Sequence, residues 1–157
     1  MIVRNLVNFS FVVSIFLIDR FSKLVMINSS TTDGSSNVSI NDFLSFNLVW
    51  NDGIAFGLFS FDQKIYYNFL TVIIILITLI ILWMILKTKG LEKIAFMMIL
   101  GGSIGNIFDR LYYSSVPDFI DIHYGNFHWF IFNVADIFIS IGVLLLITLE
   151  IFIKNKV

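Results

Sequence analysis

The sequence contains no cysteine among its 157 residues. This absence excludes disulfide bonds, thiol catalysis and metal sites built from cysteine. Charged residues are also scarce, at 13% of the chain, compared with about 25% in an average soluble domain. With a formal net charge of −1 the chain has no basic field to hold nucleic acid, so we expect no nucleic-acid partner.

Apolar residues make up 58% of the chain, more than one soluble core of this length could bury. Four stretches reach the ~20 apolar residues that a helix needs to cross a bilayer. They cover about residues 6–27, 65–86, 94–113 and 131–153. We therefore predict an all-α membrane protein with four transmembrane helices, forming a single domain over residues 1–157.

The first stretch has an alternative interpretation, because Arg4 followed by an apolar run resembles a secretory signal peptide. No small-x-small cleavage site follows, and Asp19 and Arg20 interrupt the run before it continues. We therefore interpret it as a membrane span.

Basic residues predict the orientation of the spans. Lys87, Lys89 and Lys93 lie between the second and third stretches, and further basic residues lie near both ends of the chain. Residues 28–64 hold one lysine and several aspartates, and residues 114–130 hold neither lysine nor arginine. We expect both termini in the cytoplasm and the two longer connections on the outer side.

The first outward connection has the pattern of a strand. Apolar and polar residues alternate over Leu44–Trp50, and Asn51-Asp52-Gly53 then supplies turn residues before apolar residues 54–59. This pattern predicts a small outward-facing β-hairpin or cradle between the first two helices, within a β-rich segment of about residues 37–60. Ser29–Ser36 is polar and is predicted to be a connection without regular structure.

Five carboxylates fall at the predicted outward ends of the spans or in the adjoining loop. Charge inside a membrane is costly, so each is a candidate functional group. Elements far apart in the sequence thereby bring carboxylates to one membrane depth, which scattered structural residues would have no reason to do. The five are Asp19, Asp109, Asp118, Asp121 and Asp136.

Simpler roles are available for several of these polar residues. Asp19 and Lys23 are four residues apart and can form a local ion pair on a helix, which is the interpretation we favour. The glycines of residues 101–105 are typical of close helix packing. Asn106 and Asp109 share a helix face, and Arg110 could pair with a carboxylate from another element.

The last two candidates sit beside the fourth span. Asn133 is a suitable N-terminal cap, but Asp136 lies one turn inside an apolar helix and is explained less well by capping. Asp118 follows Pro117, which disfavours a regular helix there, so Asp118 is predicted to lie in a loop. His123 and His128 are interpreted as surface residues of the same loop, without a third ligand spaced to form a metal site.

Four motifs together resemble those of the bacterial lipoprotein signal peptidases, also called signal peptidase II, over nearly the whole chain. They are Asp19-Arg-Phe-Ser-Lys23, Asn51-Asp-Gly-Ile-Ala-Phe-Gly57, Gly101-Gly-Ser-Ile-Gly-Asn-Ile-Phe-Asp-Arg110, and Val116-Pro-Asp-Phe-Ile-Asp121 followed by Phe132-Asn-Val-Ala-Asp136. The chain departs from the common pattern at Arg20, Pro117 and Trp129-Phe130, none of which is a proposed catalytic carboxylate.

The resemblance implies an aspartyl endopeptidase of the bacterial inner membrane, with its site near the outer leaflet. Its substrates would be prolipoproteins whose cysteine carries diacylglycerol, cut just before that cysteine, and it would act as a monomer in membrane lipid without metal or cofactor. Asp118 and Asp136 would be the catalytic pair. Supporting roles are implied for Asp19, Lys23, Asn51, Gly53, Asn106, Asp109, Arg110, Asn133 and Ala135.

Three other functions are compatible with intramembrane carboxylates. A proton-coupled transporter would usually place them near the bilayer midplane, whereas here they gather toward one surface. A structural assembly factor would tolerate replacement of both aspartates by asparagine. A different intramembrane aspartyl protease would resemble a Gly-x-Gly-Asp pattern, which this sequence lacks.

Overall fold

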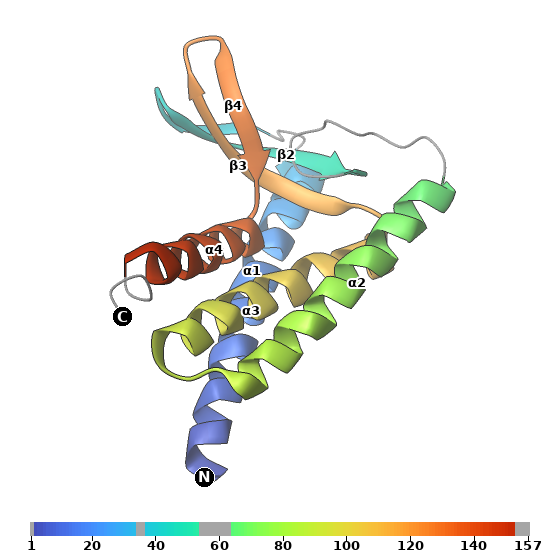
Figure 1. Ribbon diagram of the computed structural model, residues 1–157. Coiled ribbons are helices and arrows are strands. Elements are labelled where there is room, and N and C mark those ends of the chain that lie inside the picture. Colours follow the sequence, from blue (N-terminus) through green and yellow to red (C-terminus); the bar gives the residue numbers. More distant parts are fainter. Residues whose placement is uncertain (1, 34–36, 54–63, 153–157) are drawn as a thin grey trace.

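The computed structural model describes residues 2–33, 37–53 and 64–152. The helices of this part are α1 Ile2–Asp33, α2 Lys64–Lys87, α3 Gly90–Tyr113 and α4 Val134–Phe152. Its strands are β1 Asn37–Asn41, β2 Leu44–Asn51, β3 Val116–Tyr124 and β4 Phe127–Phe132. The helices lie together, and the sheet stands at one end of them (Figure 1).

Three helices in the described part are long and apolar enough to cross a membrane. They are Tyr67–Lys87, Gly90–Tyr113 and Val134–Phe152. Their exposed surfaces carry large apolar side chains such as Leu79 and Leu144, which suits a helix surrounded by lipid. The prediction of a mostly helical membrane protein with a small sheet is confirmed, whereas a fourth crossing by α1 stays a prediction.

Helix α3 is the centre of the helical layer, in contact with α1, α2 and α4. Half of the apolar 18-residue stretch of α3 is buried, compared with 17% for that of α2 and 11% for that of α4. Glycines allow this packing: a Cβ added at Gly101 would lie 2.8 Å from the Cβ of Ile15, and one at Gly102 would lie 2.5 Å from the Ala135 carbonyl oxygen. The interpretation of these glycines as packing residues is confirmed.

Gly105→Ala should lower both the yield of folded protein and its thermal stability. The added Cβ would lie 2.5 Å from Oδ2 of Asp19, a carboxylate oxygen that is fully buried between helices. Thermal denaturation in detergent measures the effect. Ile104→Ala, one residue earlier on the exposed face of α3, is the control and should have a smaller effect. Equal stability of both variants would contradict the close approach of α1 and α3.

The four strands form one antiparallel sheet in the order β1-β2-β3-β4. The strand predicted at Leu44–Trp50 is confirmed as β2, but its pairing differs from the prediction. It lies between β1 and β3, whereas the predicted second arm, residues 54–59, lies outside the described residues. The sheet therefore joins the segment after α1 to the segment after α3.

The connection predicted as a loop at residues 114–130 is instead largely β3 and the start of β4. The first half of β3 is buried, and backbone pairing to β2 supplies the hydrogen bonds that a buried segment needs. Two boundaries also change. Strand β4 takes residues 131–132, so α4 begins at Val134, and α1 continues to Asp33 through residues that we predicted to be irregular.

Candidate active site

Asp118 lies on β3, which places its side chain at the junction between sheet and helices. Only 4% of the residue is exposed. Its carboxylate accepts two amide hydrogen bonds, from Nδ2 of Asn51 at 2.9 Å and from Nδ2 of Asn133 at 2.6 Å. One donor comes from the end of β2 and the other from the residue after β4, so three elements fix this carboxylate.

Asp136 lies in the first turn of α4, where Asn133 caps the helix. The Asn133 side chain accepts a hydrogen bond from the Asp136 amide at 3.1 Å, and the Asp136 carboxylate accepts one from the Asn133 amide at 3.1 Å. This reciprocal arrangement is a capping box. Nδ2 of Asn106 donates to the other Asp136 oxygen at 2.8 Å. The predicted cap is confirmed, and Asn133 contacts both candidate catalytic carboxylates.

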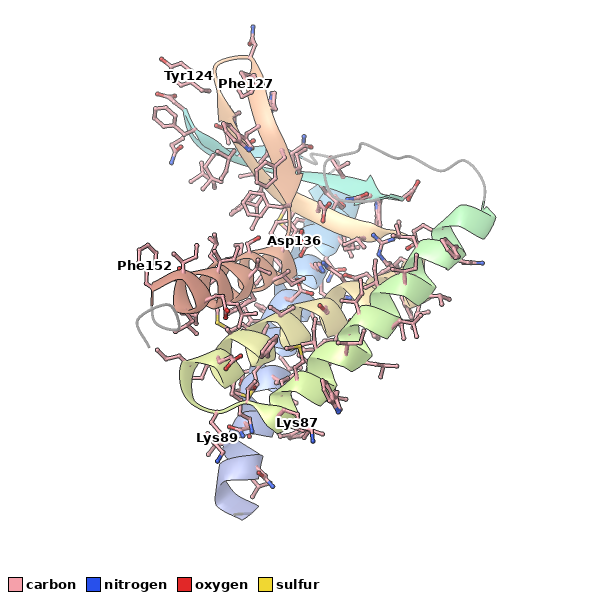
Figure 2. The ribbon with its side chains drawn as sticks, viewed as in Figure 1. Lys87, Lys89, Tyr124, Phe127, Asp136 and Phe152 are labelled. Atoms are coloured by element: carbon pink, nitrogen blue, oxygen red, sulfur yellow. The ribbon has the colours of Figure 1, made fainter. Side chains whose placement is uncertain are left out.

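A cavity of about 280 Å³ lies beside the two carboxylates. Its polar wall includes Asp118 and Asp136, and its apolar wall includes Leu70 and Ile74 of α2. Figure 2 shows Asp136 at the sheet end of α4, far from Lys87 and Lys89 at the opposite end of the helices. The apolar wall of the cavity is a surface against which a membrane-embedded segment can pack beside the two carboxylates. The remaining lining residues are Asn51, Ser103, Asn106, Arg110, Val116, Asn133 and Ile139.

Lys23 lies at the centre of a buried polar cluster behind the pair, and it is fully buried. Its Nζ donates to Asp19 at 2.9 Å, to Asn106 at 2.9 Å and to Asp109 at 2.6 Å. The second oxygen of Asp19 accepts the backbone amide of Ala135 at 2.9 Å. The local Asp19–Lys23 pair is confirmed, but it also connects α1 with α3 and α4.

Two arginines lie near the site, and Arg110 has a different partner from the one expected. Arg110 donates to the Gly53 carbonyl oxygen at 2.7 Å, and no described carboxylate forms an ion pair with it. Gly53 is held in turn by its amide, which donates to Oδ1 of Asn51 at 2.9 Å. Arg20 pairs with Asp109. The prediction that Arg110 pairs with a carboxylate is therefore wrong within the described residues.

Hydrogen bonds and ion pairs join all the site residues named from the sequence into one network. It runs from Asp118 through Asn133, Asp136 and Asn106 to Lys23. From Lys23 it continues to Asp109 on α3 and, through Asp19 on α1, to the Ala135 amide on α4. Its members are Asp19, Lys23, Asn51, Gly53, Asn106, Asp109, Arg110, Asp118, Asn133, Ala135 and Asp136. The structure brings these residues together, whereas their roles in catalysis stay predictions.

Sequence reasoning did not assign a site role to Arg20. Its guanidinium lies over the rings of Phe108 and Tyr113, 5.1 and 5.6 Å from their centroids, besides pairing with Asp109. A charge in the interior of an apolar helix was the available signal. The apolar cavity residues of α2 had no such signal, because nothing in an uninterrupted apolar run distinguishes a cavity wall from a lipid-facing surface.

The electrostatics of Asp118 favour a carboxyl that can hold a proton. Burial, followed by the charge of nearby Asp136, raises the pKa of Asp118 from 3.8 to about 6. The amide donors Asn51 and Asn133 act in the opposite direction but carry no net charge. Two neighbouring carboxyls that share one proton can deprotonate a water molecule and polarise a carbonyl group.

The raised pKa of Asp118 predicts a pH-dependent difference in stability between Asp118→Asn and the wild type. Between about pH 4 and pH 6 the folded wild type keeps a proton that the unfolded chain has lost, so ionisation of Asp118 destabilises the folded state as pH rises. The melting temperature of the variant minus that of the wild type should therefore increase from pH 4 to about pH 7 and then level off. A difference that is constant with pH would contradict the raised pKa.

Comparison with known proteins gives matches over most of the chain. Residues 11–152 match the family model described as signal peptidase (SPase) II. A lipoprotein signal peptidase of Pelagibacter ubique strain HTCC1062 is 46% identical over 149 residues, covering 95% of this chain and 90% of the relative. One from Francisella tularensis subsp. novicida strain U112 is 38% identical over 152 residues, covering 93% of both chains.

Two solved structures, both described as bacterial membrane enzymes, share the fold. One has a TM-score of 0.75 with 27% identity and covers 94% of each chain. The other has a TM-score of 0.71 with 27% identity and covers 96% of this chain and 92% of its own. The arrangement of helices and sheet is thus similar to that of these two membrane enzymes over 94–96% of the chain.

Proposed function

The chain belongs to the signal peptidase II family, and from this premise we propose that Asp118 and Asp136 cleave prolipoproteins as a two-aspartate pair. The observation that carries the proposal is the position of Asn133, which donates a hydrogen bond to each carboxylate beside the 280 Å³ cavity. The cleaved bond is the one just before a cysteine that already carries diacylglycerol.

Hydrolysis needs a nucleophile and a proton for the leaving amine. The ionised member of the pair takes a proton from water, and the resulting hydroxide attacks the scissile carbonyl carbon while the protonated member donates a hydrogen bond to the carbonyl oxygen. The proton taken from water then passes to the departing amine as the C–N bond breaks. The single shared proton belongs to the pair as a whole, because the two ionisations are coupled.

The groups that hold the pair suit this exchange of protons. Asn51, Asn106 and Asn133 position the carboxylates through neutral amides. A directly bound lysine or arginine would favour the ionised form of both carboxyls and suppress proton sharing. Lys23 is connected to Asp136 only through Asn106, which accepts a hydrogen bond from Lys23 and donates one to Asp136. We infer that the buried cluster orients the pair and that Asp19 and Asp109 act through positioning.

The substrate's signal helix would lie along α2 and α4, where Leu70, Ile74 and Ile139 line the cavity, with the acyl chains in lipid. Lys87 and Lys89 lie at the opposite end of the helices (Figure 2), and because basic loops favour the cytoplasmic side they support a cytoplasmic position for that end. The pair would then lie near the outer leaflet of the bacterial inner membrane, with α1 as a fourth span and both termini cytoplasmic. A monomer is the proposed active form, because one copy of the chain supplies both carboxylates and the amides that hold them.

Cleavage should depend on the lipid carried by the substrate. Purified protein in detergent or liposomes is given matched prolipoproteins with and without diacylglycerol on the cysteine, and the initial rates are compared. We expect cleavage just before the cysteine only for the modified substrate, because its acyl chains anchor that residue at the depth of Asp118 and Asp136. Equal rates would contradict the lipid requirement while leaving the peptidase activity intact.

A further inference from the structure

Three potential metal ligands lie together on the sheet, outside the cavity beside Asp118 and Asp136. Asp121 and His123 come from β3, and His128 comes from the neighbouring strand β4. His123 and His128 are directly paired in the β3–β4 register, and their rings stack with centroids 5.3 Å apart. One ligand atom from each of the three residues lies within 4.8 Å of the others. The third ligand that the sequence did not reveal is therefore Asp121, brought in by strand pairing.

Asp121 is a buried carboxylate, and no lysine or arginine among the described residues forms an ion pair with it. Its side chain is 1% exposed, and Nδ1 of His128 lies 2.8 and 3.0 Å from its two oxygens. The Ser45 hydroxyl is a more distant donor, at 3.4 Å. Burying a carboxylate is costly unless a cation or strong donors compensate, and a metal ion bound here would add a positive charge to the contact that His128 already makes.

His123 gives independent support for a bound ion. Its Nδ1 is buried and has no hydrogen-bond partner among the described residues. A simple His128–Asp121 pair would satisfy those two side chains and leave this nitrogen without any partner. A metal ion placed between the three residues would use it, because imidazole nitrogen is a metal ligand as well as a hydrogen-bonding group.

We propose that Asp121, His123 and His128 bind one divalent transition-metal ion of the Zn²⁺ type and so cross-link β3 to β4. Two imidazoles and one carboxylate suit Zn²⁺ better than Mg²⁺ or Ca²⁺, which prefer oxygen ligands. Ligand atoms around tetrahedral Zn²⁺ lie about 3.3 Å apart, so ligand atoms that now lie up to 4.8 Å apart would have to move closer to one another. His128 can move to do so, because 55% of its side chain is exposed.

The position of the group implies a structural role. Asp121 is three residues after Asp118 on β3, and β4 leads directly to Asn133. A cross-link between these strands would stiffen the hairpin that carries Asp118 and precedes α4. The ion would not take part in the cleavage chemistry, since none of its ligands lines the cavity. An open polar hollow lined by His123, Ser39 and Asn41 gives the ion a route from solvent.

The experiment uses the full chain in detergent, without a polyhistidine tag, stripped of metal with a chelator. Zn²⁺ is titrated in by calorimetry, and Co²⁺ is added separately so that its visible absorption reports tetrahedral coordination. We expect one ion per chain, and a melting temperature about 5 °C higher at hundredfold excess over Kd. His128→Ala should lose binding and the Co²⁺ spectrum without unfolding, because His128 is exposed.

Asp42→Asn is the matched control, because Asp42 is an exposed acid lining the same hollow but lies outside the ligand group. It should bind Zn²⁺ as the wild type does. His123→Ala should behave like His128→Ala. The proposal is overturned if the wild type binds no stoichiometric ion, or if His128→Ala binds Zn²⁺ with unchanged affinity and an unchanged Co²⁺ spectrum. Well below its melting temperature, folded His128→Ala should cleave at the wild-type rate, because none of the three ligands lines the cavity. Loss of cleavage in a variant with an intact fold and an unchanged melting temperature would overturn the structural role.

Discussion

Asp118→Asn should fold and yet lose cleavage activity by at least about a thousandfold in kcat/KM, the scale of a lost general acid–base group. Asparagine keeps the shape of the side chain, and its one oxygen can still accept a hydrogen bond from Asn51 or from Asn133, although not from both. It cannot take a proton from water, so the remaining Asp136 has no partner with which to share one. Asp136→Asn should show the same loss.

The measurement is the initial rate on a diacylglyceryl-modified prolipoprotein, with circular dichroism and melting temperature recorded for each variant. Asp42→Asn is the control, because it makes the same chemical change at an exposed turn. If folded Asp118→Asn keeps nearly the full rate, the pair is wrongly assigned and Asp109 becomes the next candidate. If well-folded wild-type protein does not cut at all, the proposed substrate is wrong.

Lys23→Met should have the second-largest effect, this time on folding. Methionine fills much of the same space but leaves Asp19 without its cation, while Asp109 keeps Arg20. Breaking a buried ion pair by removing one partner costs about 3–5 kcal/mol. We expect a sharp fall in folded yield and in melting temperature.

A double variant separates lost charge from lost packing. Lys23→Met combined with Asp19→Asn removes the unpaired charge and should recover part of the stability lost in Lys23→Met alone. Lys89→Met, at the exposed end of the helices away from the sheet, is the control and should change the melting temperature little. No recovery in the double variant would indicate that Lys23 contributes through packing and not through its charge.

The sequence predicted the parts of the site that depend on local spacing. Asn133 and Asp136 are three residues apart at a helix start, so their capping relation follows from helix geometry. The helix-packing glycines of α3 and the Asp19–Lys23 pair were predictable for the same reason. That these groups form one site was predicted from the family resemblance, because spacing within one helix does not report which helices pack together.

The features that were mispredicted depend on pairing between distant segments. Strand β3 pairs with β2, and Val49 faces Asp118 across a sequence separation that no local pattern reports. Residues 114–130 therefore resembled a loop, and Asp121 could not be connected with His128 until β4 folded back on β3. The contact of Asn133 with Asp118 is hidden for the same reason, although the cap itself was predicted.

The junction between sheet and helix at Asn133 limits where this chain can change in length. Strand β4 ends at Phe132 and α4 begins at Val134, so a single residue separates the two elements. An insertion there would turn α4 by about 100° relative to the sheet and carry Asp136 away from Asn106. The β3–β4 turn at Gly125 carries no contact to the pair and can absorb an added residue. Insertions and deletions in evolution should therefore accumulate at the hairpin tip and be absent from the junction.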